Sequence, residues 1–282
     1  MLKYLNIKGS IMLNHKKVSI PVIQQVGYDN LFMTEPWMID VLKMVLKIEN
    51  GGFVDVGANI GQTLLKLKSV SESIEYIGFE PNPSCVYYLK NLIEENKFTN
   101  CTIIPVGISD ITNIEVLHFF SASRTDSSAS MITNFRPLEN IVRNEYIPVF
   151  EFEQIRKKIN LNKFSVLKID VEGAEWEVVK SFYPAIEKCK PIILMEILPV
   201  YSEQHVNRME RQKEIIQILH HLDYSVFRVV KKMDVFIDLF EVMEIEMHAD
   251  INSCEYVMVP NFKKEKLLNH NRQRLQNKVS LV

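Results

Sequence analysis

The sequence predicts an α/β fold: a doubly wound, mostly parallel sheet with an inserted hairpin. From residue 52 onward, short apolar runs alternate with longer amphipathic runs, a pattern typical of βαβ units. The chain has 282 residues, of which 47% are hydrophobic and 24% are charged, so it can bury one sizeable core. Parallel strands need right-handed crossovers, and this order of elements therefore predicts helices on both faces of one sheet.

Five parallel strands and four helices are expected along this alternation. Each strand is a short apolar run, whereas each helix carries its apolar residues on one side. We expect strands at 53–56, 75–80, 102–106, 165–170 and 191–197, and helices at 62–70, 83–96, 173–182 and 208–222.

Two further strands, at 114–120 and 147–152, interrupt the alternation. Between them lies "SASRTDSSASMITNFRPLENIVRN", residues 121–144, which we call the polar segment and expect to be a mobile lid or an ordered binding loop. The β-rich sequence after residue 222 can complete the sheet with an antiparallel edge. The expected domains are an N-terminal cap at 1–50 with an amphipathic helix at 35–48, a main domain at 51–262, and a basic, flexible tail at 263–282.

Composition and charge argue against several classes of protein. Lys and Arg number 33 and Asp and Glu number 35, a formal net charge of -2, so no nucleic-acid partner is expected. Charges interrupt every apolar run near the N-terminus, which predicts no signal peptide and no membrane insertion and indicates a cytoplasmic protein. The four cysteines form no CxxC pair and are expected to be reduced thiols. Whether the protein forms a homo-oligomer stays open.

The stretch "FVDVGANIGQTLLKL", residues 53–67, is typical of a buried strand, a glycine-bearing turn and the start of a helix. Glycines let the backbone approach a ligand closely, and a helix N-terminus adds free N–H groups. A pyrophosphate cradle of the G-x-G-x-x-G type would have glycine near Asn59 and no carboxylate at Asp55. Asp55 would repel a phosphate but could hold the ammonium of a methionine group, with Gly57 and Gly61 leaving room, so S-adenosylmethionine is favoured over NAD.

Two acidic residues at later strand ends support a nucleoside site. Glu80 in "YIGFEPNP" follows Gly61 by 19 residues, near the roughly 20-residue spacing at which a carboxylate binds ribose hydroxyls. Asp110 in "IIPVGISD" follows the next strand and is a candidate partner for the exocyclic amine of adenine. The alternatives are a glycine turn that only permits tight packing, a Glu80 that only caps a helix, and an Asp110 in a plain surface turn.

Three carboxyl groups gather around Gly173 in "VLKIDVEGAEWEVV", at the end of a predicted strand. Dehydrating a carboxylate is unfavourable, so Asp170, Glu172 and Glu175 are expected to face a crevice rather than the core. Ligands bind at this edge of open α/β sheets. Helix capping is the alternative for Glu172 and Glu175, and pairing with a basic residue is the alternative for Glu196, which ends the neighbouring strand.

In this order and spacing, "FVDVGANIGQTLL", "YIGFEPNP" and "VLKIDVEGAEWEVV" resemble the FkbM family of S-adenosylmethionine-dependent methyltransferases, a branch of the class I methyltransferase fold. The resemblance covers about residues 30–260. It implies a seven-stranded, Rossmann-like sheet and methyl transfer to a hydroxyl, typically of a sugar, a glycan or a secondary metabolite. Glu153 stands where the family has an aspartate, so no role is carried over there. Carried over by position, Asp55, Gly57, Asn59, Gly61 and Glu80 would bind the cofactor, and Asp170 and Glu172 would face the reaction centre.

Methyl transfer from a sulfonium is an in-line displacement, which positioning alone accelerates strongly. A sugar hydroxyl is a weak nucleophile at neutral pH, so a general base is expected. Asp170, Glu172 and Glu196 are the candidates, and His205 is a less favoured one. A divalent metal held by Asp170 and its acidic neighbours could replace the base, but the metal-free route is favoured.

Two other classes of function stay open. An NAD-dependent oxidoreductase or epimerase on a similar sheet is disfavoured by Asn59 and Asp55, and a non-catalytic nucleotide-binding domain is disfavoured by the carboxyl groups of Glu80 and Asp170. The acceptor, a small molecule or a glycan, is not identified by the sequence. Aromatic residues at this spacing usually pack in a core, but the candidates to line its pocket are Tyr201, Phe150, Trp176 and residues 121–130.

Overall fold

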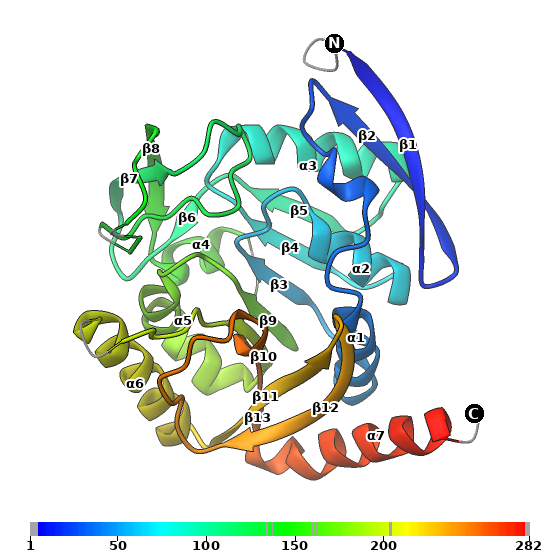
Figure 1. Cartoon of the computed structure of the whole chain (residues 1–282), viewed down its shortest axis with the longest axis vertical. Coiled ribbons are helices and arrows are strands. Elements are labelled where there is room, and N and C mark those ends of the chain that lie inside the picture. Colours follow the sequence, from blue (N-terminus) through cyan, green and yellow to red (C-terminus); the bar gives the residue numbers. More distant parts are fainter. Residues whose placement is uncertain are drawn as a thin grey trace.

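A computed structural model of the chain describes residues 5–133, 135–136, 138–159, 161, 163–202 and 205–279. Its centre is an eight-stranded sheet with helices on both faces, and a three-stranded sheet and an N-terminal hairpin lie beside it (Figure 1). The doubly wound α/β fold that the sequence predicts is therefore confirmed.

The parallel half of the large sheet consists of the five strands that the apolar runs predict. Every neighbouring pair among them is parallel, and the third strand in space is the first in sequence. The chain therefore reverses direction across the sheet at that strand, and the carboxyl ends on both sides of it form one edge. In spatial order the strands are β5 (Cys101–Ile104), β4 (Tyr76–Phe79), β3 (Phe53–Val56), β9 (Val166–Ile169) and β10 (Ile192–Glu196).

Three antiparallel strands complete the sheet, namely β13 (Glu255–Pro260), β11 (Tyr224–Lys232) and β12 (Val235–Val242). β13 pairs with β10, β11 with β13, and β12 with β11. The family resemblance implies seven strands, and the eighth arises because the chain turns back at Met233 and Asp234. Both residues have positive φ, the conformation of a tight hairpin turn, so β12 is added as an edge strand.

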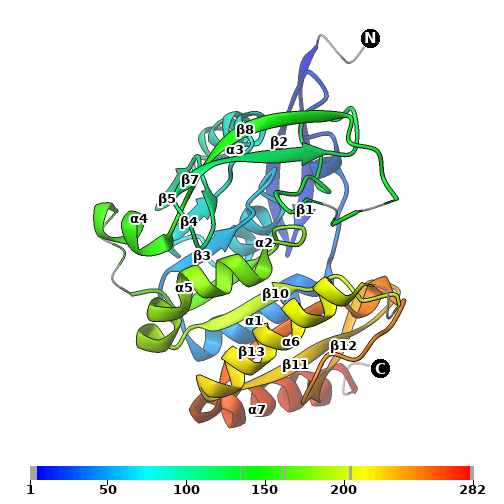
Figure 2. The same cartoon turned by 90° about the vertical axis from the view of Figure 1, so that its left-hand side faces the viewer.

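The helices form a layer on each face of the sheet (Figures 1 and 2). Neighbouring residues of β3 point to opposite layers, since Phe53 belongs to one apolar cluster and Val54 to the other. Phe53 lies on the side of α1 (Trp37–Ile48), α2 (Gln62–Val70), α3 (Pro83–Asn96) and α7 (Asn261–Val279), and Val54 lies on the side of α4 (Phe152–Lys158), α5 (Glu175–Cys189) and α6 (Val206–His221).

The inserted strands form a separate small sheet of β6 (Gly107–Ile108), β7 (Asn113–Phe119) and β8 (Arg143–Phe150). The polar segment connects β7 to β8. At the N-terminus, β1 (Asn6–Leu13) and β2 (Lys16–Ile23) form a hairpin whose apolar side packs on α2 and α3. Short 3₁₀ turns occur at Asp29–Leu31 and Ile251–Ser253.

The C-terminal region differs from the flexible tail that the sequence predicts at 263–282, because the chain is helical as far as Val279. Leu267 is fully buried against the sheet. The Arg274 guanidinium donates to the backbone carbonyls of Phe236 and Ile237 on the edge strand β12. These contacts hold the helix across the edge of the sheet. Over the part of the chain that the structure describes, no helix is long and apolar enough to span a membrane.

Candidate active site

A cavity opens where β3, β4 and β9 end, at the reversal of the strand order. Its walls come from the turns after these strands, from the small sheet and from the polar segment, and we call it the central cavity. Its volume is about 70 Å³, enough for a few water molecules. Its polar lining includes Asn59, Glu80, Asn82, Asp126, Asp170 and Glu172.

The glycine turn after β3 forms the floor of the central cavity. Gly57 has a φ of 88°, and a Cβ there would lie 1.8 Å from the Asp170 carbonyl oxygen, so only glycine lets the ends of β3 and β9 meet this closely. Asn59 has a φ of 43°. Gly61 has a φ of 80° and begins α2. The predicted change from strand to turn to helix is confirmed here.

Glu80 connects the glycine turn to the start of α3. Its carboxyl accepts a hydrogen bond from the Asn59 backbone N–H at 2.7 Å and another from the Asn82 backbone N–H at 2.8 Å. Burial raises the pKa of Glu80 to about 7, against the effect of both N–H groups. Each carboxyl oxygen has further capacity to accept a hydrogen bond. Glu80 therefore presents a hydrogen-bond acceptor to the cavity, as expected of the residue that the sequence predicts to bind ribose hydroxyls.

Asp55 lies on the other side of the sheet and does not line the central cavity. Its Oδ2 accepts from the Tyr76 hydroxyl at 2.7 Å, and its Oδ1 lies 3.9 Å from Lys168 Nζ without a hydrogen-bond partner. Burial raises the pKa of Asp55, against the attraction of the Lys168 ammonium. In this conformation Asp55 belongs to a buried polar network beneath the site.

Asp110 also lies outside the residues that line the central cavity. It forms an ion pair with Lys180 of α5, with Oδ2 2.5 Å from Nζ. Its neighbours Gly107 and Ile108 do line the cavity. The structure therefore brings the backbone of this turn to the site, whereas the Asp110 side chain points to α5.

Asp170 is held by a buried lysine on its own strand. Lys168 Nζ lies 2.8 Å from Asp170 Oδ2. Burial alone would raise the pKa of Asp170, but the Lys168 ammonium holds it below its ordinary value. Asp170 is therefore an ionised carboxylate and a weak base.

Glu196 lies on the α1 side of the sheet, in a second and smaller cavity that Asp170 also lines. The Asp170 charge, together with burial, raises the pKa of Glu196 well above neutrality. Glu196 is thus a neutral carboxylic acid at physiological pH and can donate to Asp170. It does not line the central cavity.

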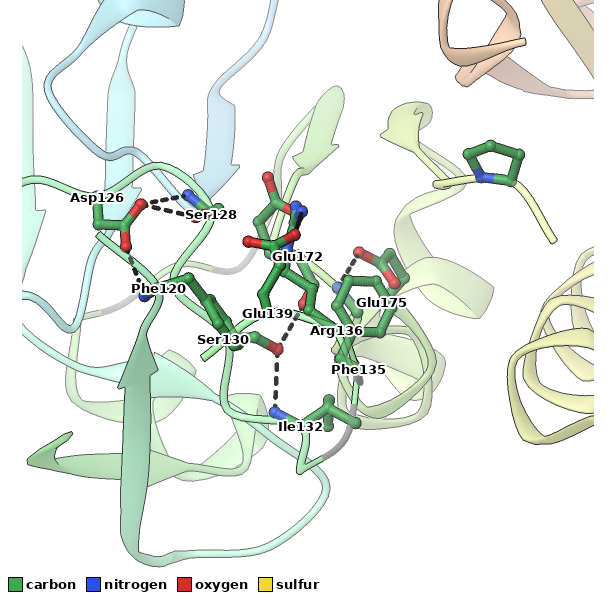
Figure 3. A network of polar contacts seen from close by, with 12 residues as sticks. Phe120, Asp126, Ser128, Ser130, Ile132, Phe135, Arg136, Glu139, Glu172 and Glu175 are labelled. Atoms are coloured by element: carbon green, nitrogen blue, oxygen red, sulfur yellow. Dashed lines mark hydrogen bonds and ion pairs between the residues drawn. The ribbon is translucent and has the colours of Figure 1, made fainter. Parts of the chain in front are cut away.

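Glu172 lines the central cavity and is held by the polar segment (Figure 3). Its Oε2 lies 2.7 Å from Arg136 Nη2, and its backbone carbonyl accepts from the Ser130 hydroxyl at 2.6 Å. Glu172 has a φ of 52°, a left-handed conformation that is unfavourable for a residue other than glycine. Burial and the Asp170 charge raise the pKa of Glu172 to about 7, and the Arg136 guanidinium opposes them. Such a carboxyl can accept a proton near neutral pH.

Glu175 turns back onto the same loop. Its Oε1 accepts from the Gly173 backbone N–H at 2.8 Å, and burial raises its pKa to about 7. Glu175 is the first residue of α5, which is the position expected if it caps the helix, the alternative role considered from the sequence. Glu175 lines a separate cleft between α5 and α6, not the central cavity.

The cleft between α5 and α6 contains two other sequence candidates, Trp176 and His205. The Trp176 ring is approached by cations, with Lys180 Nζ 3.9 Å and the Arg211 guanidinium carbon 5.3 Å from its centre. His205 Nδ1 lies 3.3 Å from the Ser202 hydroxyl. Of the remaining aromatic candidates, Tyr201 is exposed and Phe150 packs against the main core.

The sequence motifs did not point to Lys168 or Arg136, and they pointed to Ser130 only as part of the segment 121–130 that could line an acceptor pocket. Lys168 has a local signal, because a lysine two residues before Asp170 in an otherwise apolar strand lies on the same face of the sheet. Arg136 and Ser130 have none, since they reach Glu172 across 36 and 42 residues of sequence. Within the described ranges, no group of three His, Cys, Asp or Glu residues is arranged to hold a metal ion.

Comparisons with known proteins agree with the motifs. The family model of the methyltransferase FkbM domain matches residues 55–226, more than half of the chain. No curated protein matches the chain.

Solved structures of methyltransferases are similar at low sequence identity. Methyltransferase FkbM from Methylobacillus flagellatus shares 16% identity at a TM-score of 0.44 over 74% of this chain, which spans only 43% of that protein. An O-methyltransferase from Bacillus cereus in complex with SAH shares 10% identity at a TM-score of 0.45, over 79% of this chain and 80% of its own. A SAM-dependent O-methyltransferase from Thermotoga maritima shares 12% identity at a TM-score of 0.40, over 89% and 76%.

Proposed function

This chain belongs to the FkbM family of S-adenosylmethionine-dependent methyltransferases, and we propose that it methylates a hydroxyl group of a sugar or glycan. The position of the Glu172 carboxyl at the wall of the central cavity is the observation that best supports oxygen as the methyl acceptor. A hydroxyl loses its proton on methylation, and a base whose pKa is about 7 is suited to accept it at neutral pH.

The residues around the central cavity fit a nucleoside donor. Glu80 keeps capacity to accept hydrogen bonds from ribose hydroxyls, and Gly57 and Asn59 of the glycine turn line the cavity beside it. A carboxyl at the position of Glu80 binds ribose hydroxyls in NAD as well, so the choice of S-adenosylmethionine as the donor rests on the family. Asp126, Ser127 and Met131 of the polar segment line the same cavity, so a bound donor would contact this segment.

Each carboxyl group of the site has a separate task in this proposal. When bound, S-adenosylmethionine supplies the methyl group and leaves as S-adenosylhomocysteine. Glu80 binds the nucleoside, and Glu172 accepts the proton that the acceptor hydroxyl loses. Asp170 stays ionised beside Lys168, and its charge raises the proton affinity of Glu172. Glu196 stays protonated, donates a hydrogen bond to Asp170 and does not act as a base.

A sugar acceptor is supported by the polar character of the surroundings. The polar segment brings Asp126 and Ser127 to the central cavity, and the cleft between α5 and α6 presents His205, Asn207 and further amide, carboxyl and guanidinium groups. Such groups bind hydroxyls in several orientations.

Calorimetry with S-adenosylmethionine, S-adenosylhomocysteine and NAD tests the donor site. Binding of the first two without NAD supports the proposal, and tight binding of NAD alone would end it. A screen of nucleotide sugars and glycans with a methyl-labelled donor then tests the acceptor. Label in a methyl ether of a sugar is expected, whereas label on nitrogen or carbon of another class of compound would refute the sugar hydroxyl.

A further inference from the structure

Three residues of the polar segment hold one turn at the wall of the central cavity. Ser130 donates to the Glu172 carbonyl, and Arg136 pairs with the Glu172 carboxyl. Phe135 packs on Gly173, where a Cβ would lie 2.5 Å from its ring. Figure 3 shows Ser130, Phe135 and Arg136 converging on this turn. The polar segment therefore contacts three parts of this turn: the backbone carbonyl of Glu172, the carboxyl of Glu172, and Gly173.

The polar segment is itself fixed on both sides of these contacts. Asp126 accepts from the backbone N–H groups of Phe120 and Ser121 at 2.8 Å each. Ser130 exchanges two backbone hydrogen bonds with His118 of β7, at 2.9 and 3.0 Å. On the other side, the Arg208 guanidinium of α6 donates to the Phe135 carbonyl at 2.6 Å and lies 4.2 Å from its ring centre. The part of the segment that the structure describes between residues 121 and 136 thus has a defined docked conformation.

In that conformation the same segment lines the donor cavity and contacts the residue that we propose as the proton acceptor. Four residues that precede Arg136 in the segment line this cavity, namely Asp126, Ser127, Ala129 and Met131. We propose that Arg136 is a positioning residue for methyl transfer: it fixes the Glu172 carboxylate at the cavity wall, so the proton acceptor is complete only when the polar segment is docked. This inference rests on the proposed function, because it assigns Glu172 a proton to accept.

Charged groups from several elements face Glu172. Asp126 comes from the polar segment and Asp170 from the end of β9, and both raise the pKa of Glu172. Glu175 of α5 and Glu196 of β10 also interact with its charge, as does the Arg208 cation of α6. Arg136 is in direct contact, at 2.7 Å. Removing Arg136 therefore leaves Glu172 among carboxylates that increase its affinity for a proton.

Carboxyl NMR titration tests this without an acceptor. In protein labelled with ¹³C at the glutamate carboxyl carbons, the Glu172 resonance is identified by its loss in Glu172→Gln. We expect a midpoint near pH 7 in the wild type and at least one unit higher in Arg136→Gln, a tenfold rise in proton affinity. Arg136→Lys should lie between them, because it retains the charge without the planar guanidinium.

The matched control is Arg124→Gln, also in the polar segment, where the guanidinium donates to Gln24 and not to Glu172. Its Glu172 midpoint should equal that of the wild type. An Arg136→Gln midpoint equal to the wild type would overturn the inference, and so would an equal shift in Arg124→Gln. If thermal unfolding shows that Arg136→Gln is not folded, Arg136→Lys provides the same comparison. An unshifted Glu172 midpoint in Arg136→Lys overturns the inference as well.

Binding of S-adenosylhomocysteine to the same samples separates the two proposals. A wild-type protein that fails to bind it contradicts the proposed function, whereas the titration of Glu172 is unaffected by that result. With an acceptor from the sugar screen, Arg136→Gln should lower kcat at pH 7 and recover at higher pH, with KM little changed. A loss of kcat that is the same at every pH would show a merely structural role for Arg136.

Discussion

The carboxyl groups of the site differ because their immediate neighbours differ. Lys168 keeps Asp170 ionised, and the ionised Asp170 in turn keeps Glu196 protonated. Glu172 lies between these two cases, since burial and Asp170 favour its neutral form and Arg136 favours its ionised form. A base for a sugar hydroxyl needs both proton affinity and ionisation at neutral pH, and among these three groups that combination is found at Glu172.

Glu80 and Asp170 should have separable effects on binding and turnover. We expect Glu80→Gln to weaken S-adenosylhomocysteine binding by at least about tenfold, or 1.4 kcal/mol, because it removes the charged acceptor between two backbone N–H groups. Asp170→Asn should change that affinity less and lower kcat more. Calorimetry and steady-state kinetics on both variants provide the comparison, and equal effects on affinity would show that the roles are assigned wrongly.

At the scale of elements, local chemistry was enough to predict β3, α2 and α3 with the bounds that the structure has. Gly61 begins α2 in a left-handed conformation, and Asn82 caps α3 by accepting from Ser84 N–H. α5 instead continues through Pro184 to Cys189, beyond its expected end at residue 182, because Ala185 and Ile186 are buried in the main core. Tertiary packing there overrides a local helix-breaking signal.

The turn after β3 should tolerate no side chain at Gly57. Gly57→Ala combines a positive φ with a Cβ 1.8 Å from a backbone oxygen, and we expect it to destabilise the protein by about 3 kcal/mol or more. Gly52→Ala is the matched control, since the nearest atom to its Cβ would be Glu75 Oε2 at 3.4 Å. Chemical denaturation measures both, and similar losses in the two variants would contradict the role of close approach.

The start of α5 should make stability depend on pH through Glu175. Its pKa is raised from 4.5 to about 7 by burial, so the folded state binds the extra proton. Its contribution to stability is therefore full below about pH 4.5 and is lost as pH rises through about 7. Glu175→Gln keeps an acceptor for Gly173 N–H and cannot ionise. The free energy of unfolding of this variant minus that of the wild type should therefore be about 2 kcal/mol larger at pH 8 than at pH 5.

Thermal unfolding at both pH values measures the effect of Glu175→Gln. The control is Glu187→Gln on the same helix, where the side chain is exposed. If both variants show the same pH dependence of stability as the wild type, Glu175 is not its cause.

At the scale of the whole molecule, the sequence predicts which strand ends meet but not what lies over them. Glu80, Asp170 and Glu172 follow from the order of parallel strands, because carboxyl ends of neighbouring strands share an edge. The position of the polar segment depends on long-range contacts such as Arg136 with Glu172 and Arg208 with Phe135. None of these leaves a periodic or spaced pattern in the sequence, so the segment could be predicted only as a lid or a loop.

Donor binding should change the polar segment more than any distant part of the molecule. Asp126, Ser127 and Met131 of this segment line the central cavity, so a nucleoside bound there would pack against them. We expect S-adenosylhomocysteine to slow amide hydrogen exchange in residues 121–133. Exchange in the β1–β2 hairpin, which lines none of this cavity, should stay the same. Bound ligand without any change in residues 121–133 would mean that the nucleoside does not pack against this segment.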